Sequence, residues 1–237
     1  MLVVGASGGI GEGVTRALLT LGATVVAAGR SEARLNGLAE YAADAGPGIL
    51  RPHVVDVSDP DSAAVRSALA QEYGTFDGAV LTLGNWGPQG RTGLLEVTDE
   101  LWDTMIADNL SSHFRALRAV TPLLAPDGAL VHFTGFSAEL PYPGAALIGA
   151  TNAAKKSLLR TLTAELDGKG PRIYELVIGP VRTRPRAAAG ADSVSWLSGE
   201  DLGRHAGELI ARRGPWTAEP LQYLLDRASG VLTMSPQ

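Results

Sequence analysis

Runs of apolar residues alternate with stretches of helical periodicity along the whole chain. The apolar runs are rich in valine and leucine and only partly alternate with polar residues, which is typical of strands covered on both faces. We predict strands at residues 2–5, 24–28, 50–57, 78–83, 129–134, 172–178 and, from the weakest pattern, 231–234. Helical patterns lie between them at residues 11–21, 31–45, 60–73, 99–124, 148–166 and 198–212. This alternation predicts βα units and an α/β fold with a parallel sheet of about seven strands.

The helix starts and the loops carry local signals of their own. Ser31 and Asp59 stand where helix N-caps are expected, and acidic residues follow Thr98 in a first turn. Segments rich in glycine and proline follow strands at residues 83–93, 141–149 and 179–193. Because loops at the carboxyl ends of parallel strands frame the ligand crevice, we expect binding loops here, with ordinary surface loops as the alternative.

Composition excludes several classes of function. The 237 residues carry a net charge of −5 and no basic stripe, so we expect neither nucleic acid nor an anionic membrane as a partner. No apolar run approaches the ~20 residues that a membrane span needs. The absence of cysteine excludes disulfides and thiolate chemistry, and the histidines show no ligand spacing, so we expect no metal. A cytoplasmic location is the default expectation.

A glycine-dense turn joins the first strand to the first helix. Gly5, Gly9 and Gly11 are spaced as Gly-x-x-x-Gly-x-Gly, with Ser7 and Ile10 between them. Glycines let the backbone approach a phosphate, and the following helix directs its positive N-terminal end at the same point. Turn glycines without a ligand are the alternative, but three at this spacing after a first strand favour a pyrophosphate site.

This spacing resembles that of the short-chain dehydrogenase/reductase family, and further matches follow in order to about residue 183. The resemblance implies a single doubly wound, Rossmann-like domain over residues 1–237 that binds NAD(P). It implies that Asp56 and Val57 lie beside the adenine, with a helix cap as the alternative role of Asp56. Gly84 is the glycine retained after the fourth strand. Near the sixth strand Gly179 is kept, and Thr183 matches the residue that contacts the nicotinamide carboxamide.

The end of the second strand bears on the choice of cofactor. Sites that prefer NAD usually place an acidic residue here for the ribose 2′-hydroxyl, whereas an arginine accommodates the 2′-phosphate of NADP. This chain has Gly29, Arg30 and Ser31. We therefore expect NADP(H) rather than NAD(H), with Arg30 and Ser31 in the cofactor site.

The helix that carries the chemistry departs from the family pattern. Family members take a proton from a tyrosine one helical turn before a lysine, a spacing that puts both on one face. Here Lys155 matches the lysine, and the resemblance implies that it holds the nicotinamide ribose. Thr151 stands at the tyrosine position, and its hydroxyl is too short and too weakly acidic to replace a phenol. Asn109 matches the structural asparagine of the family. Lys156 is expected on another helix face, where its replacement should change little.

The substrate-binding serine of the family is also missing, because Gly135 stands at its position. Ser137 and Tyr142 are candidate substitutes for the lost polar groups. Asn85 and Trp86, after the fourth strand, are further candidates to face substrate. For each of these four side chains, ordinary loop packing is the alternative.

These residues predict a divergent family member that binds NADP(H). We expect an oxidoreductase acting on a small carbonyl or alcohol, with a relay built from Lys155 and water, Ser137 or Tyr142. The alternatives are a nucleotide-binding regulatory protein without turnover, and a pocket repurposed for non-redox cyclisation or elimination. The resemblance also implies a homodimer or homotetramer formed through the helices at 99–124 and 148–166. We expect His113 and His132 to be structural side chains with satisfied hydrogen bonds.

Overall fold

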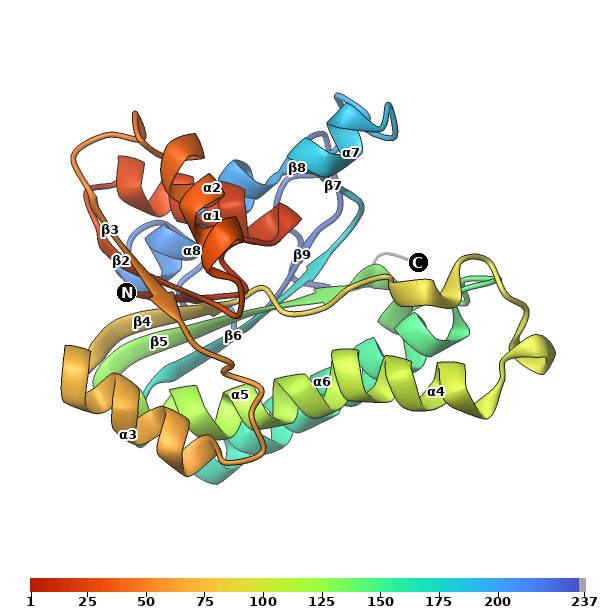
Figure 1. Cartoon of the computed structure of the whole chain (residues 1–237), viewed down its shortest axis with the longest axis horizontal. Coiled ribbons are helices and arrows are strands. Elements are labelled where there is room, and N and C mark those ends of the chain that lie inside the picture. Colours follow the sequence, from red (N-terminus) through yellow and green to blue (C-terminus); the bar gives the residue numbers. More distant parts are fainter. Residues whose placement is uncertain (235–237) are drawn as a thin grey trace.

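The computed structural model describes residues 1–234, and seven parallel strands form its central sheet (Figure 1). The strands are β1 (Leu2–Val4), β2 (Thr24–Gly29), β3 (Ile49–Val54), β4 (Phe76–Leu81), β5 (Leu124–Gly135), β6 (Arg172–Ile178) and β9 (Leu221–Leu224). They lie in the order β3-β2-β1-β4-β5-β6-β9, and every neighbouring pair is parallel. The predicted α/β fold with a doubly wound, seven-stranded parallel sheet is confirmed.

Helices cover both faces of the sheet (Figure 1). One face carries α1 (Gly9–Thr20), α2 (Glu32–Tyr41) and α8 (Gly199–Ile210), and the other carries α3 (Ser62–Tyr73), α5 (Ser112–Val120) and α6 (Ala146–Leu166). Each layer has its own apolar core, with Val14 and Leu18 in the first and Leu69 and Leu159 in the second. Burial on both faces explains the nearly continuous apolar runs of the strands. Within residues 1–234, no helix is long and apolar enough to cross a membrane.

Close packing of α8 on α1 fixes the start of α1. A Cβ on Gly13 would lie 2.6 Å from the carbonyl carbon of Gly199, and one on Gly203 would lie 2.7 Å from Val14 Cα. Only glycines allow the two helix backbones to approach this closely. The position of the glycine turn before α1 therefore depends on α8.

The predicted helix at 99–124 is one helical region with two irregular turns. It consists of α4 (Asp99–Ile106), a π-helical turn (Ala107–Ser111), α5 and a 3₁₀ turn (Thr121–Leu123). π-Helical turns interrupt the regular hydrogen bonding and are frequent at functional sites. This one contains Asn109.

Two local predictions are wrong. The N-cap of α3 is Asp61 and not Asp59, because Asp61 Oδ1 accepts the backbone N–H of Ala64 at 3.0 Å. The seventh strand is β9 and not residues 231–234, where Leu232 only forms an antiparallel bridge with Tyr223. The sequence pattern missed β9 because Gln222, inside the strand, is fully buried and breaks the apolar run.

Candidate active site

The crevice of this fold lies where the strand order reverses, between β1 and β4. The chain passes from β1 to β2 on one side and from β4 to β5 on the other, so the loops after β1 and β4 diverge. Gly5 follows β1 with a φ of 76°, and Gly84 follows β4 with a φ of 138°. Thr82 joins the two strand ends, since its hydroxyl donates to the carbonyl oxygens of Val4 at 2.8 Å and Gly5 at 3.1 Å.

The glycine turn is too tight for any other residue at its last position. A Cβ on Gly11 would overlap the carbonyl oxygen of Gly5 and lie 2.9 Å from Ala6 Cα. Ser7, in the middle of the turn, is buried. The turn therefore keeps its backbone, rather than side chains, at the mouth of the crevice.

Helix α1 begins without a capping side chain, because its N-cap is Gly8. Side chains do cap the starts of other helices, namely Ser31, Asp61, Thr98 and Ser198. The first-turn N–H groups of Gly9, Ile10 and Gly11 have no acceptor within the helix. Such N–H groups at a positive helix end bind anions, so the turn fits the pyrophosphate of a dinucleotide.

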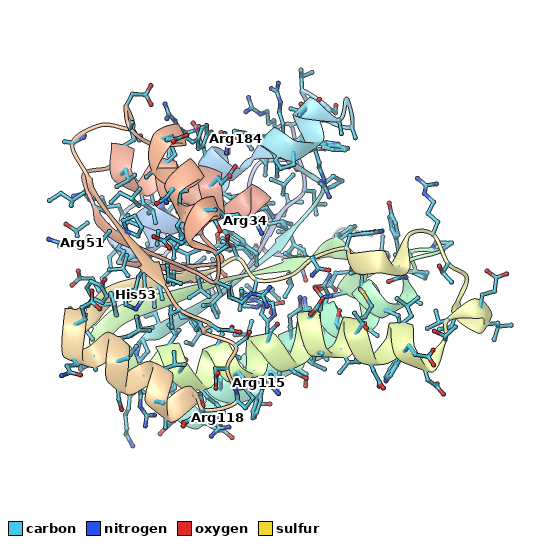
Figure 2. The ribbon with its side chains drawn as sticks, in the orientation of Figure 1. Arg34, Arg51, His53, Arg115, Arg118 and Arg184 are labelled. Carbon is cyan, nitrogen blue, oxygen red and sulfur yellow. The ribbon has the colours of Figure 1, made fainter. Side chains whose placement is uncertain are left out.

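A second arginine, Arg34, lies in the first turn of α2, just after the predicted 2′-phosphate residues Arg30 and Ser31. Arg30, at the end of β2, is exposed, and the Ser31 hydroxyl accepts the backbone N–H of Arg34 at 3.4 Å as the α2 cap. Arg34 then donates from Nη2 to the carbonyl oxygen of Ser7 at 2.7 Å, which ties α2 to the glycine turn (Figure 2). Sequence reasoning missed Arg34. Its spacing of four residues from Arg30 was the available signal.

Asp56 and Val57 follow β3 and have different surroundings. Asp56 is exposed, and its Oδ1 accepts both the backbone N–H of Ser58 at 2.9 Å and the Ser58 hydroxyl. It therefore orders its own turn and does not cap α3. Val57 is buried in the apolar core.

The chain brings Asn109 and Lys155 together beside Gly84. Asn109 Oδ1 accepts the backbone N–H of Asn85 at 2.9 Å. A Cβ on Gly84 would lie 3.4 Å from Asn109 Oδ1 and 3.9 Å from Lys155 Nζ. The loop after β4, the π-helical turn and α6 therefore meet at one point of the crevice.

Lys155 is buried, and its charge acts on two buried histidines. The rings of His113 on α5 and His132 on β5 pack edge to face with centroids 4.7 Å apart. Both are fully buried. The ring nitrogens of His132 have no hydrogen-bond partner among residues 1–234, so the expectation of satisfied hydrogen bonds is wrong for His132, whereas a hydrogen bond with the Asn109 backbone acts to raise the pKa of His113. Burial and the charge of Lys155 hold both histidine pKa values well below the ordinary value, which keeps the rings neutral. Burial lowers the pKa of Lys155 to about 8.

Thr151 lies one turn before Lys155 on the buried side of α6. Its hydroxyl donates to the carbonyl oxygens of Leu147 at 2.9 Å and Ile148 at 3.1 Å. Both contacts lie within the helix itself. The Thr151 side chain therefore stabilises its own helix and extends no acidic group into the crevice.

Asn152 occupies the space where the family serine would stand. A Cβ on Gly135 would lie 2.6 Å from Asn152 Nδ2, so a side chain at this position would clash with Asn152. Asn152 Nδ2 donates a hydrogen bond to Ser137 Oγ at 3.1 Å. Sequence reasoning did not single out Asn152, and its place after Thr151 gave no signal. The pair of Asn152 and Ser137 is the polar group that this chain puts near the end of β5.

Tyr142 lies apart from these groups on the loop after β5. Its ring is exposed and packs edge to face against Trp86 at 6.0 Å between centroids. Gln89 joins the two loops, because its Nε2 donates to the carbonyl oxygen of Gly144 at 3.0 Å. The loops after β4 and β5 are thus held together, with Trp86 and Tyr142 on their surface.

The segment after β6 returns to the glycine turn. The methyl carbon of Thr183 lies 3.2 Å from the position a Cβ would take on Gly9. Thr183 also caps α7 (Arg184–Ala188), accepting the backbone N–H of Arg186 at 3.4 Å. A Cβ on Gly179 would overlap the carbonyl oxygen of Leu225, so the close approach of β9 accounts for that glycine.

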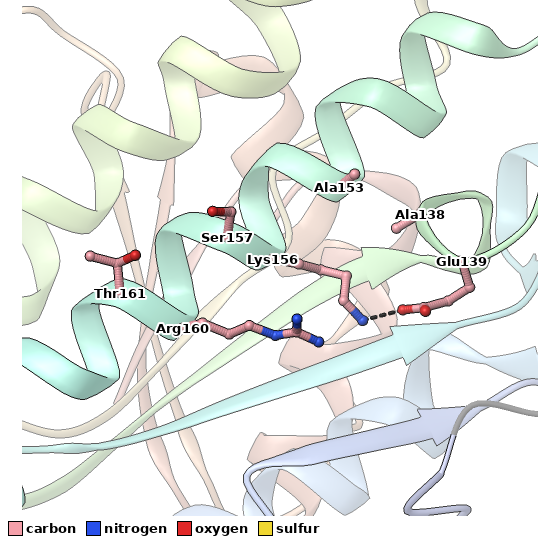
Figure 3. Close-up of a pocket in the computed structure, with 7 residues that line it drawn as sticks. All are labelled: Ala138, Glu139, Ala153, Lys156, Ser157, Arg160 and Thr161. Carbon is pink, nitrogen blue, oxygen red and sulfur yellow. Dashed lines mark hydrogen bonds and ion pairs between the residues drawn. The ribbon is translucent and has the colours of Figure 1, made fainter.

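Lys156 does face away from Lys155, but it is buried rather than solvated. It forms ion pairs with Glu139, as Figure 3 shows, and with Glu175 at 3.7 Å. Glu175 is itself buried, which raises its pKa, and it accepts the Thr134 hydroxyl at 3.0 Å. A cavity of about 320 Å³ adjoins this cluster. Replacement of Lys156 is therefore not expected to be neutral.

The seven-stranded parallel sheet with a glycine turn at its switch point defines a Rossmann-like fold. The sequence profile of the family described as Enoyl-(Acyl carrier protein) reductase matches residues 5–204. The chain belongs to the short-chain dehydrogenase/reductase family, whose members bind nicotinamide cofactors.

A 3beta-hydroxysteroid dehydrogenase of Mediterraneibacter gnavus is 31% identical over 85% of this chain and 78% of its own length. Two solved structures share the fold. A short chain oxidoreductase of Pseudomonas aeruginosa with NADPH and an atypical catalytic center has a TM-score of 0.78, with 24% identity over 94% of this chain and 93% of its own. A Brucella melitensis 3-oxoacyl-[acyl-carrier protein] reductase with bound NAD has a TM-score of 0.79, with 22% identity over 99% and 90%.

Proposed function

We propose that this protein is an NADP(H)-dependent oxidoreductase that acts on a small carbonyl or alcohol without a tyrosine in its proton relay. The observation that carries the proposal is the pairing of an uncapped glycine turn with Lys155 and Asn109 at Gly84 in one crevice. When bound, the nicotinamide supplies or accepts the hydride.

The residues of this chain divide the work of holding the cofactor. The first-turn N–H groups of Gly9, Ile10 and Gly11 would hold the pyrophosphate, as their lack of helical acceptors supports. Lys155 would donate to the nicotinamide ribose, and Thr183, beside Gly9, would contact the carboxamide.

Two arginines support the preference for NADP(H). Arg30 is exposed at the end of β2, and Arg34 lies against the glycine turn through its hydrogen bond to Ser7. Guanidinium groups bind phosphate through charge-assisted hydrogen bonds, which contribute about 1.5–3 kcal/mol each. No acidic residue occupies positions 29 to 31 to favour a free 2′-hydroxyl.

The proton relay is the part of the proposal that departs from the family. Thr151 takes the position of the tyrosine, and its hydroxyl is committed to backbone carbonyl oxygens of α6. Lys155 is a buried acid whose pKa is about 8, so it holds a proton at neutral pH and releases it more readily than an exposed lysine. We propose that Lys155, through water or the Ser137 hydroxyl, protonates the substrate oxygen, with Tyr142 as the alternative donor.

A second candidate function is nucleotide binding without turnover. Two observations favour this second function. The Thr151 hydroxyl donates to a backbone carbonyl oxygen of α6, and Asn152 fills the space beside Gly135. Both positions thus lack the groups that act on substrate in the family. In this case the glycine turn and Lys155 still bind the dinucleotide.

Calorimetric titration of NADP⁺ and NAD⁺ tests the cofactor half of the proposal. We expect NADP⁺ to bind about tenfold or more tightly, and Arg30→Ala to remove this preference while NAD⁺ binding is kept. Arg118→Ala is the matched control, since Arg118 lies on α5, across the sheet from α2 (Figure 2). Equal affinities for the two nucleotides would refute the preference. NADPH oxidation with activated ketones then separates the two candidate functions.

A further inference from the structure

Two exposed aromatic side chains, Trp86 and Tyr142, contact each other at one side of the crevice. Trp86 stands two residues after Gly84, the residue beside Lys155 Nζ and Asn109 Oδ1. Because successive Cα atoms are about 3.8 Å apart, the Cα atoms of Trp86 and Gly84 lie within roughly 8 Å of each other. Tyr142 comes from the loop after β5, and its ring centroid is 6.0 Å from that of Trp86. The aromatic pair of Trp86 and Tyr142 therefore flanks the crevice.

Hydrogen bonds hold the aromatic pair in place. The indole N–H of Trp86 donates to the carbonyl oxygen of Gly90 at 3.0 Å. Gln89 is fully buried, and its Nε2 donates to the carbonyl oxygen of Gly144 at 3.0 Å, which joins the loop after β4 to the loop after β5. Proline stands on both sides of Tyr142 and restricts the backbone there. The two rings thus have defined positions before any ligand binds.

The geometry of the aromatic pair suits a third flat ring. The two ring planes meet at 82°, and 42% of Trp86 and 58% of Tyr142 remain exposed. Aromatic rings attract a further ring by offset stacking or by an edge-to-face contact, in addition to the gain from burying apolar area. A saturated ring of the same size gains only from the buried area. The aromatic pair therefore favours an aryl group over an alkyl group of equal size.

We propose that the substrate is an aryl aldehyde, an aryl ketone or the corresponding alcohol, with its ring against Trp86 and Tyr142 and its oxygen directed towards Lys155. This inference rests on the oxidoreductase function proposed above and names the class of compound that the same crevice takes. The aromatic pair follows β4 and β5, whereas the glycine turn follows β1. The aryl group and NADP⁺ therefore bind side by side and do not compete.

NMR titrations that observe the ligand test this proposal without turnover. Acetophenone and cyclohexyl methyl ketone carry the same acetyl group on six-membered rings that differ in aromaticity. Each ketone is titrated into the intact protein with and without saturating NADP⁺. Trp86→Leu/Tyr142→Leu removes both rings and keeps apolar side chains, whereas Tyr142→Phe keeps the ring. Phe114→Leu is the matched control, because Phe114 is 46% exposed and lies against Arg118 on α5 (Figure 2).

We expect acetophenone to bind about two- to tenfold more tightly than cyclohexyl methyl ketone, which is the usual contribution of a favourable aromatic pair. The preference should be lost in Trp86→Leu/Tyr142→Leu and kept in Tyr142→Phe and Phe114→Leu. Three results would each overturn the proposal: equal affinities in the wild type, a preference that survives in the double variant, or displacement of acetophenone by NADP⁺.

NADPH oxidation with the two ketones separates this inference from the function on which it rests. An aryl preference in binding without NADPH oxidation would refute the oxidoreductase function and retain the aryl site. NADPH oxidation with equal affinities for the two ketones would retain the oxidoreductase function and refute the aryl site.

Discussion

Replacing Lys155 by methionine should make the nucleotide-free protein more stable. The side chain keeps its apolar stem and loses an ammonium that has no ion-pair partner in residues 1–234. The pKa of Lys155 is 10.5 in an ordinary setting and about 8 in the folded protein. At 1.36 kcal/mol per pKa unit, this difference means that the buried charge lowers the free energy of unfolding by about 3 kcal/mol.

The destabilising charge of Lys155 should also make the free energy of unfolding depend on pH. Below pH 8 the amine is protonated in the folded and unfolded chains alike, so the buried charge lowers the free energy of unfolding by its full amount. Between about pH 8 and 10.5 the folded chain has released the proton and the unfolded chain has not. The Lys155 contribution to the free energy of unfolding therefore rises with pH across this range, and Lys155→Met should lack that rise.

Thermal and denaturant unfolding from pH 6 to 10 measure both effects. A stabilisation of about 3 kcal/mol corresponds to a rise in Tm of roughly 6–12 °C for a chain of this size. The same variant should bind NADP⁺ about tenfold more weakly, since a charge-assisted hydrogen bond to the ribose is lost. The gain in stability and the loss of binding would then have one origin, which is the unpaired charge.

Two other lysines provide the controls. Lys156→Met removes the ion-pair partner of Glu139 and Glu175 and should lower the free energy of unfolding by about 3–5 kcal/mol. Lys169→Met, at an exposed position, should change it by less than about 0.5 kcal/mol. If Lys155→Met were less stable than the wild type at pH 7, Lys155 would have a stabilising partner and the reasoning would fail.

Three further changes test the crevice. Thr151→Tyr should raise NADPH oxidation with activated ketones by up to about 10²–10⁴-fold, the usual contribution of positioned proton transfer, and an unchanged rate would count against a missing acid. Gly11→Ala should abolish nucleotide binding in calorimetry, because its Cβ would overlap the backbone of the turn. Gly37→Ala is the control, since a Cβ at Gly37 has no atom within 4 Å. This variant should bind nucleotide normally, and its free energy of unfolding should rise by about 0.5–1 kcal/mol. Arg184→Ala removes the paired hydrogen bonds to Glu12 in the first turn of α1, so NADP⁺ should bind several-fold more weakly through charge repulsion. Adding Glu12→Gln should restore the affinity, and a double variant that stays weak would refute this role of the charge.

Local sequence patterns were sufficient for most of the fold. The valine- and leucine-rich runs located six of the seven strands, because strands buried on both faces must be apolar along their length. The glycine spacing predicted the turn before α1, since the close approach of Gly11 to the backbone of Gly5 excludes a Cβ. Ser31 was recognised as a cap because the cap contact spans only three residues. Each of these signals lies within a few residues of the element that it specifies.

Pairs of residues far apart in the chain could not be predicted in this way. The sequence indicated that His113 and His132 are structural side chains, but only the tertiary structure brings their rings into contact. Arg34 meets Ser7 because β1 and β2 are neighbours in the sheet. Strand β9 was missed because its buried Gln222 is satisfied by the carbonyl oxygens of Trp216 and Glu219, which no apolar pattern reports.

The two consecutive lysines show the division most clearly. The sequence by itself determined that Lys155 and Lys156 occupy different faces of α6, because successive helical residues are about 100° apart. Only the tertiary structure decided which side chains lie near each lysine. Glu139, from the segment after β5, and Glu175, from β6, compensate the charge of Lys156, whereas the charge of Lys155 acts on the neutral histidines. The charge state and reactivity of a buried amine depend on such neighbours, which folding brings from distant parts of the chain.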